Sequence, residues 1–314
     1  MRFNPKARLD TSRVRDRGRG RGGGPRGGGL GSGGGLPIPG GLGVGGGIGG
    51  VIIVVLLLVL TQCVGGGSGS LPAGGGGLDA SRMGSTDRYA SCRTGADAND
   101  SADCARVAVE NSLYDYWKHT LGDRFHAEHE VDTFTGATST GCGRASADMG
   151  PFYCPVDQTI YLDTTFFEDI LQRRLGGPDG AFVEPYVIAH EYGHHIQNLL
   201  GTMSKVKTQQ GATSDSVRLE LQADCYAGMW TRSATTTDDA TGQALFAELT
   251  DADIRQAIQA ATAVGDDRIQ QRSGGQVNPD QWTHGSAEER VRWFRTGYDQ
   301  GALSACDTFS ANRL

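Results

Sequence analysis

The chain has 314 residues, which is enough for one large domain or two small ones. Nine Lys or Arg residues stand against two Asp up to Arg26, whereas the rest of the chain carries 20 basic and 34 acidic residues, a net charge of −14. An acidic body argues against nucleic acid as the main partner. Most of the 49 glycines precede residue 80, which excludes an ordinary globular fold for the first quarter.

Residues 1–41 are basic and rich in glycine, and we predict that they form a disordered cytoplasmic tail. The stretch "RGRGRGGGPRGGG" has the composition of RNA-binding arginine–glycine segments, so RNA binding is one alternative. The residues between its arginines include no aromatic side chain to stack on bases. A tail that sets membrane topology explains the same charges.

An apolar segment follows the basic tail. No charged residue occurs between Arg26 and Asp79, and residues 51–60 are all Val, Ile or Leu. A membrane-spanning helix needs roughly 20 mainly apolar residues, so we predict one at 42–64. Basic residues before it place the N-terminus in the cytoplasm and the rest of the chain outside. The alternatives are a buried helix, a late signal peptide, or a lipoprotein site ending at Cys63.

The remaining chain divides into a second glycine-rich linker at 65–85 and a folded domain at 86–314. Its six cysteines form an even set, at 92, 104, 142, 154, 225 and 306. An even number in an exported domain predicts disulfides. Six cysteines allow 15 pairings, of which 92–104, 142–154 and 225–306 are the natural choice by sequence proximity. A cysteine zinc cluster is disfavoured because no CxxC spacing occurs.

Helical and strand patterns in the folded domain predict a mostly helical unit with a small sheet. A β-branched and aromatic run at 158–163 predicts a strand. Capping residues and 3.6-residue periodicity predict helices, with Asp163 or Thr165, Thr250 and Ser286 as expected N-caps and Pro185 near the start of one helix. The predicted helices span 103–122, 166–176, 185–201, 216–230, 250–265 and 286–301.

The helix predicted at 185–201 contains "HEYGH", an H-E-x-x-H motif formed by His190, Glu191 and His194. Histidines four residues apart lie on one helix face, so both imidazoles can reach one zinc ion. The bound zinc lowers the pKa of a water toward ~7, and the adjacent glutamate can take its proton as a general base. The motif therefore predicts a catalytic zinc site, provided that a third ligand exists.

The third ligand is predicted on the next helix, in "ELQAD". Glu220 can ligate the metal, and Asp224, one turn later, can accept a hydrogen bond from a ligating histidine. A metzincin site is excluded because Gln197 and Leu200 stand where that pattern requires Gly and His. Three protein ligands leave one position open, which is typical of a catalytic zinc.

The other histidines have different expected roles. His195 is rotated ~100° from His194 on the helix, so we interpret it as a packing or hydrogen-bonding residue. His126 and His129 are the alternative seed of a second metal site, but we interpret them as residues of a polar surface loop. His284 precedes a capped helix, and we predict that it helps to stabilise the oxyanion formed during amide hydrolysis. Tyr226 and Tyr192 are alternative candidates for that role.

Several blocks resemble the neutral zinc metallopeptidase family of membrane-anchored bacterial proteins. They include "GPFYCPVDQTIYLD", "VIAHEYGHHIQNLLG", "RLELQADCYAGMW", "GDDRIQ" and "THGSAEERVRWFRTGYDQG" with "CDTF", after the Arg/Gly-rich head and its apolar segment. The resemblance implies a gluzincin-like fold in which His190, His194 and Glu220 bind zinc and Glu191 is the catalytic base. It also implies that "QTIYLD" forms a sheet edge that pairs with an extended peptide.

We therefore expect an α+β, mostly helical, zincin-like (gluzincin-type) metallopeptidase domain with a small sheet, anchored in the cell membrane by its N-terminal helix. The expected cofactor is Zn²⁺, the expected substrate is a peptide or protein, and no nucleic acid partner is expected. The principal alternative is a non-catalytic envelope protein in which zinc holds a binding surface together.

Overall fold

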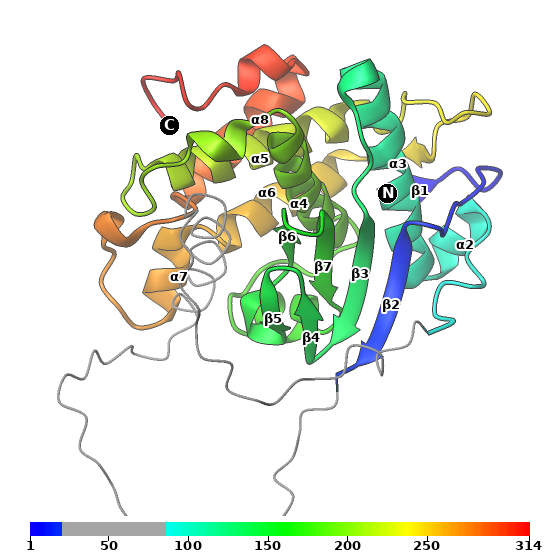
Figure 1. The fold of residues 1–314 in the computed structure, drawn as a ribbon, viewed down its shortest axis with the longest axis horizontal. Helices are drawn as coiled ribbons and strands as arrows, with labels where there is room; N and C mark the ends of the chain where they lie inside the picture. Colours follow the sequence, from blue (N-terminus) through cyan, green and yellow to red (C-terminus); the bar gives the residue numbers. More distant parts are fainter. Residues whose placement is uncertain (21–85) are drawn as a thin grey trace, which may run out of the picture.

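A four-stranded sheet lies at the centre of the fold, with strand order β2-β3-β7-β6 (Figure 1). Its strands are β2 (Val14–Arg19), β3 (Glu130–Thr135), β7 (Thr159–Asp163) and β6 (Phe152–Cys154). The first three run parallel, and β6 pairs antiparallel with β7. This computed structural model describes residues 1–20 and 86–314. The helices and strands of these residues confirm the predicted α+β class.

The helices pack beside this sheet and against one another. They are α2 (Gly95–Asp100), α3 (Ala102–Leu121), α4 (Val183–Leu199), α5 (Asp215–Ser233), α6 (Asp251–Ala263), α7 (Asp266–Arg272) and α8 (Ala287–Gln300), with a π-helix at Phe167–Gln172. Two small sheets pair β1 (Arg2–Phe3) with β8 (Phe246–Glu248), and β4 (Ala137–Thr140) with β5 (Gly143–Ser146). Helix α4 contacts α3, α5, β6 and β7, so it is buried in the middle of the domain.

Most of the predicted helix ends are confirmed. Thr250 and Ser286 each form a capping box at the start of α6 and α8. Gly201 adopts a left-handed conformation after α4 (φ 73°), which a glycine reaches without steric cost. Of the two N-caps expected for the helix at 166–176, Asp163 and not Thr165 is the side-chain acceptor, since the hydroxyl and backbone N–H of Thr165 both donate to Asp163.

Helices α5 and α8 approach each other closely where glycines replace side chains. A Cβ added to Gly228 would lie 2.0 Å from the carbonyl oxygen of Phe294, and one added to Gly297 would lie 1.8 Å from that of Cys225. Such a crossing brings the backbones together only because both positions lack a side chain. This close crossing fixes which side chains of α8 lie against α5.

The prediction that residues 1–41 form a disordered tail is wrong for residues 1–20. This segment contributes β1 and β2, and β2 joins the main sheet by parallel pairing of Val14 with Val131 and Arg15 with Asp132. Phe3, at 1% exposure, is part of the hydrophobic core. The N-terminal twenty residues are therefore an integral part of the folded domain.

The arginines of this segment face acidic residues of the domain. Their charges had suggested a cytoplasmic or RNA-binding tail, whereas the structure pairs them within the fold, where opposite charges partly compensate the cost of burial. The pairs are Arg13 with Glu110 at 2.6 Å, Arg15 with Glu130 at 3.1 Å, and Arg17 with Asp132. The opposite charges of the two parts of the chain thus reflect complementary surfaces.

The pairing of β2 with β3 also bears on the predicted membrane topology. A single crossing between residues 20 and 86 would put these two strands in different compartments, so the pairing and the predicted single-pass arrangement exclude each other. The predicted span at 42–64 and linker at 65–85 lie outside the described residues. Within residues 1–20 and 86–314, no helix combines the length and the apolar character needed to cross a membrane.

Three disulfides confirm the predicted cysteine pairing. They join Cys92 to Cys104, Cys142 to Cys154, and Cys225 to Cys306. The second ties β6 to the turn between β4 and β5, and the third ties α5 to the C-terminal segment. Two of the elements around the functional site are thereby cross-linked to their neighbours.

Candidate metal centre

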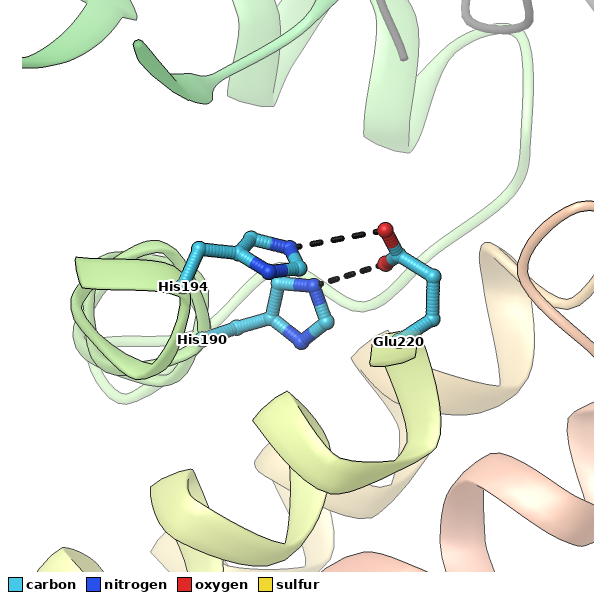
Figure 2. Close-up of side chains that lie close together, drawn as sticks. All are labelled: His190, His194 and Glu220. Atoms are coloured by element: carbon cyan, nitrogen blue, oxygen red, sulfur yellow. Dashed lines mark hydrogen bonds and ion pairs between the residues drawn. The ribbon is translucent and has the colours of Figure 1, made fainter. Parts of the chain in front are cut away.

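Helix α4 presents His190 and His194 on one face, one turn apart, as the motif predicts (Figure 2). Their imidazole ring centroids lie 4.8 Å apart, and both residues are buried. Because α4 is covered on nearly every side, each of its polar side chains needs a partner inside the protein. The partners of these two histidines come from α5 and from α4 itself.

Helix α5 brings Glu220 to the same point. Ser214 caps this helix, and its carboxylate-bearing face lies against α4. Glu220 Oε2 is 3.1 Å from His190 Nε2, and Glu220 Oε1 is 3.5 Å from His194 Nε2. Ligand atoms around a tetrahedral zinc, each at ~2.0–2.1 Å from the ion, are about 3.3 Å apart. Both distances are close to this value, and the three ligand atoms all lie within 4.8 Å of one another, so one cation can lie between them.

The outer nitrogen of each histidine has an acceptor. Asp224 Oδ1 lies 2.9 Å from Nδ1 of His190, and Gln197 Oε1 lies 2.8 Å from Nδ1 of His194. In both residues Nδ1 therefore carries a proton, and Nε2, which faces Glu220, is the atom that would bind a metal ion. Asp224 lies where its spacing predicts. The role of Gln197 was missed, although it lies three residues after His194 on the same helix.

Two further residues that the sequence analysis missed hold Asp224 in place. Arg290, on α8, donates to both oxygens of Asp224, at 2.8 and 3.0 Å, and the hydroxyl of Tyr186 donates to Oδ1 at 2.6 Å. Burial would raise the pKa of Asp224, but Arg290 and His190 lower it to about 2. Tyr186 lies four residues before His190, which is a local signal. Arg290 has no such signal, since only the packing of α8 on α5 brings it here.

The electrostatics of the three ligands favour a bound cation. Burial would raise the pKa of Glu220, yet the nearby His194, His284 and His190 hold it well below its ordinary value. Burial likewise opposes protonation of His190, but Asp224 and Glu220 raise its pKa to about 10. The carboxylates of Asp224 and Glu220 thus favour a positive charge on His190, and a cation bound at Nε2 would take the place of the Nε2 proton. A donor set of two imidazoles and one carboxylate suits Zn²⁺.

Glu191 lies next to this centre without being one of its ligands. Burial raises its pKa above the ordinary value, while His194 and His190 oppose the shift. The backbone of Tyr153, in β6, also interacts with the Glu191 carboxyl group. A buried carboxylate with a raised pKa beside a metal site is suited to accept and return a proton.

His284 lies in the same cleft, where its charge influences Glu220. Its loop is fixed by Asp266, which accepts hydrogen bonds from three consecutive backbone N–H groups of residues 283–285, at 2.7, 2.7 and 3.0 Å. Burial opposes protonation of His284, but Glu220 and Asp266 raise its pKa. Of the alternative candidates, Tyr226 packs against Trp117 at 5.3 Å and Tyr192 is fully buried beside Glu128.

The remaining histidines lie outside the centre, as expected. His195 bonds Tyr153 and the backbone carbonyl of His126, and burial lowers its pKa to about 4. His129 is exposed beside Glu130. Among the described residues, only His190, His194 and Glu220 form a cluster with metal-ligand geometry.

The cleft beside the metal ligands is mostly apolar, and β6 forms part of its wall. The prediction that "QTIYLD" forms the sheet edge is wrong: β7 is an interior strand between β3 and β6, and β6 is the edge. The sequence did not distinguish them because both are short apolar runs and edge position depends on pairing order. The apolar wall includes Phe152, Phe166, Val187, Met203, Leu219, Val264 and Ile269.

Comparison with known proteins gives consistent matches. The family model described as "Putative neutral zinc metallopeptidase" matches residues 1–309, a range that includes β2 as well as the metal-ligand helices. The uncharacterized protein Rv2575 of Mycobacterium tuberculosis is 51% identical over 225 residues, which cover 71% of this chain and 76% of that protein. The uncharacterized protein YpfJ of Escherichia coli is 46% identical over 182 residues, 56% of this chain and 60% of that protein. No solved structure matches.

Proposed function

Because this chain belongs to the neutral zinc metallopeptidase family, we propose that it is a zinc-dependent peptidase with a gluzincin-type site. The observation that carries the proposal is the convergence of two imidazole nitrogens and one carboxylate from α4 and α5, with the uncoordinated Glu191 beside them. Three protein ligands leave one zinc position open, as catalysis requires and a purely structural zinc does not.

In this proposal the residues of the chain divide the work of hydrolysis. His190, His194 and Glu220 would hold a zinc ion, which would supply Lewis acidity and lower the pKa of a water toward ~7. Glu191 takes the proton of the water that attacks the scissile carbonyl carbon, and then passes that proton to the leaving amine nitrogen. His284 donates a hydrogen bond to the carbonyl oxygen as that oxygen gains negative charge.

The shape and polarity of the cleft support a peptide as substrate. The edge strand β6 offers backbone groups along one wall, so an extended peptide can add to the sheet by β-augmentation. Arg290, the one arginine among the described residues of the wall, is paired with Asp224 and is not free to bind a charged substrate side chain. The rest of the wall is largely apolar, which favours peptides with large apolar side chains near the scissile bond.

We also propose that the folded unit lies outside the cytoplasm. Three disulfides are typical of proteins that fold in an oxidising compartment. Since β2 belongs to the same sheet as β3, this location applies to residues 1–20 as well as to residues 86–314.

The test uses the purified full-length chain. Its zinc content is measured, and its cleavage of a peptide library is compared with and without a chelator. We expect that Glu191→Gln keeps the zinc stoichiometry and lowers kcat by at least about 100-fold. Glu168→Gln is the matched control, because Glu168 lies on the surface, with its side chain 67% exposed.

Two outcomes would contradict the proposal. Zinc binding without cleavage of any peptide would instead support the non-catalytic envelope protein, particularly if zinc removal unfolded the chain. Cleavage by Glu191→Gln at the wild-type rate would refute the assigned role of this residue.

A further inference from the structure

One face of α4, distinct from the metal-ligand face, lies along the edge strand β6. Glu191, His195 and Asn198 follow one another at spacings of four and three residues, so they form one ridge on the helix. All three interact with a single residue of the strand, Tyr153. The helix that carries the metal ligands is thus joined to the strand that lines the cleft.

The hydrogen bonds of this ridge have one consistent direction. The carbonyl of His126 can only accept, so the contact at 2.8 Å assigns the ring proton of His195 to Nε2. Nδ1 of His195 then accepts from the hydroxyl of Tyr153, at 3.1 Å. The same hydroxyl oxygen accepts from Nδ2 of Asn198, at 3.0 Å. Every polar atom in this chain of bonds has a partner.

The position of Tyr153 gives these bonds a consequence for the site. Its side chain is anchored to His195, while its backbone interacts with the carboxyl group of Glu191. Strand β6 has only three residues and pairs in the sheet with β7 alone. Tyr153 is 4% exposed and His195 is fully buried, so water does not compete for their bond. Apolar packing could bring strand and helix together, but it would not set their relative position to within a hydrogen-bond length.

We propose that His195 and Tyr153 are positioning residues that hold the edge strand β6 in register with helix α4, so that a peptide bound along β6 is aligned with Glu191. This inference rests on the proposed peptidase function. Neither residue touches the reacting atoms through its side chain. The two act through the placement of Glu191 relative to the strand, where a displacement of about 1 Å is enough to cost on the order of 100-fold in rate.

The experiment compares four variants of the zinc-loaded full-length chain: His195→Leu, His195→Gln, Tyr153→Phe and the double variant His195→Leu/Tyr153→Phe. We expect His195→Leu and Tyr153→Phe each to lower kcat by about 10- to 100-fold, with zinc content unchanged and KM altered less than about 3-fold. The double variant should be no worse than the poorer single variant, because both break one connection. A glutamine can accept from Tyr153 and donate to His126, so His195→Gln should recover most of the activity.

A second measurement does not depend on activity. Backbone amide exchange of residues 152–154 should be faster in His195→Leu than in the wild-type chain, and restored in His195→Gln. Ser112→Ala is the control, because it removes a comparable buried hydrogen bond, from Trp230 at 3.1 Å, that joins α3 to α5 and involves neither β6 nor α4. It should lower stability without changing kcat or the exchange of residues 152–154.

The outcomes separate this inference from the proposed function. Losses of kcat that multiply in the double variant, or an unchanged kcat in both single variants, would refute the positioning role. If the wild-type chain cuts no peptide, the proposed function fails. In that case the exchange measurement decides alone, and unchanged protection of residues 152–154 in His195→Leu would refute the connection.

Discussion

Replacing Arg13 by Met tests whether the N-terminal segment is an integral part of the fold. The guanidinium of Arg13 bonds Glu110 at 2.6 and 3.4 Å, and Glu110 is fully buried. Burial and the nearby Glu128 both raise the pKa of Glu110, and Arg13 is the cation that opposes them. Methionine keeps much of the apolar contact of the arginine side chain but removes its charge.

The expected cost follows from the burial of the partner. Removing one member of a buried ion pair typically destabilises a protein by about 3–5 kcal/mol, because the remaining charge has no partner. Arg13 itself is 19% exposed, so we expect the lower end of that range, about 3 kcal/mol of unfolding free energy at pH 8. The cost should be smaller at pH 5, since Glu110 can then take up a proton and become neutral.

The assay is urea unfolding followed by circular dichroism at pH 5 and pH 8. Arg2→Met is the control, because its ion pair with Glu248 is exposed (61% and 54%) and is expected to contribute less than about 1 kcal/mol. The double variant Arg13→Met/Glu110→Gln should recover part of the lost stability. A cost for Arg13→Met no larger than that of the control at pH 8 would mean that residues 1–20 do not pair with the domain as described.

Three further predictions concern the helices and the site. Gly228→Ala should destabilise the protein by at least about 2 kcal/mol despite the better helix propensity of alanine, because the new Cβ would lie 2.0 Å from a carbonyl oxygen of α8. Gly275→Ala is the control and should leave stability unchanged, because the atom nearest to its new Cβ is 3.5 Å away. Equal melting temperatures of the two variants would contradict the expected clash. Burial and neighbouring carboxylates raise the pKa of Asp115 to about 6. The stability that its protonated form contributes is therefore complete below pH ~4 and should be lost as the pH rises through 6, which lowers the melting temperature. Asp115→Asn should abolish that fall in melting temperature, and a variant with the wild-type pH profile would contradict the prediction. Gln197→Leu should weaken zinc binding about 10- to 100-fold in competition with a chromophoric chelator, because it removes the acceptor of His194 Nδ1; wild-type affinity would show that this bond does not orient the ligand.

Local patterns in the sequence were sufficient for the longer helices and the two histidine ligands, whereas the short helices α2 and α7 were not predicted. His190 and His194 share a face because any α-helix brings residues four apart together, whatever surrounds it. Thr250 and Ser286 cap their helices through bonds that reach only three residues along the chain. Glu220 and Asp224 were predicted from the same spacing rule applied to a second helix.

The tertiary structure decided the rest, because it depends on contacts between distant residues. Val14 pairs with Val131, more than a hundred residues away, and the basic, glycine-rich composition around β2 resembles a free tail until the acidic strand β3 is placed beside it. Whether β6 or β7 forms the sheet edge depends on pairing order, which leaves no trace in either strand. Arg290 reaches Asp224 only because α8 packs closely on α5. Periodicity and capping act within a few residues, whereas strand order and buried charge partners are set by the energy of the whole packed domain.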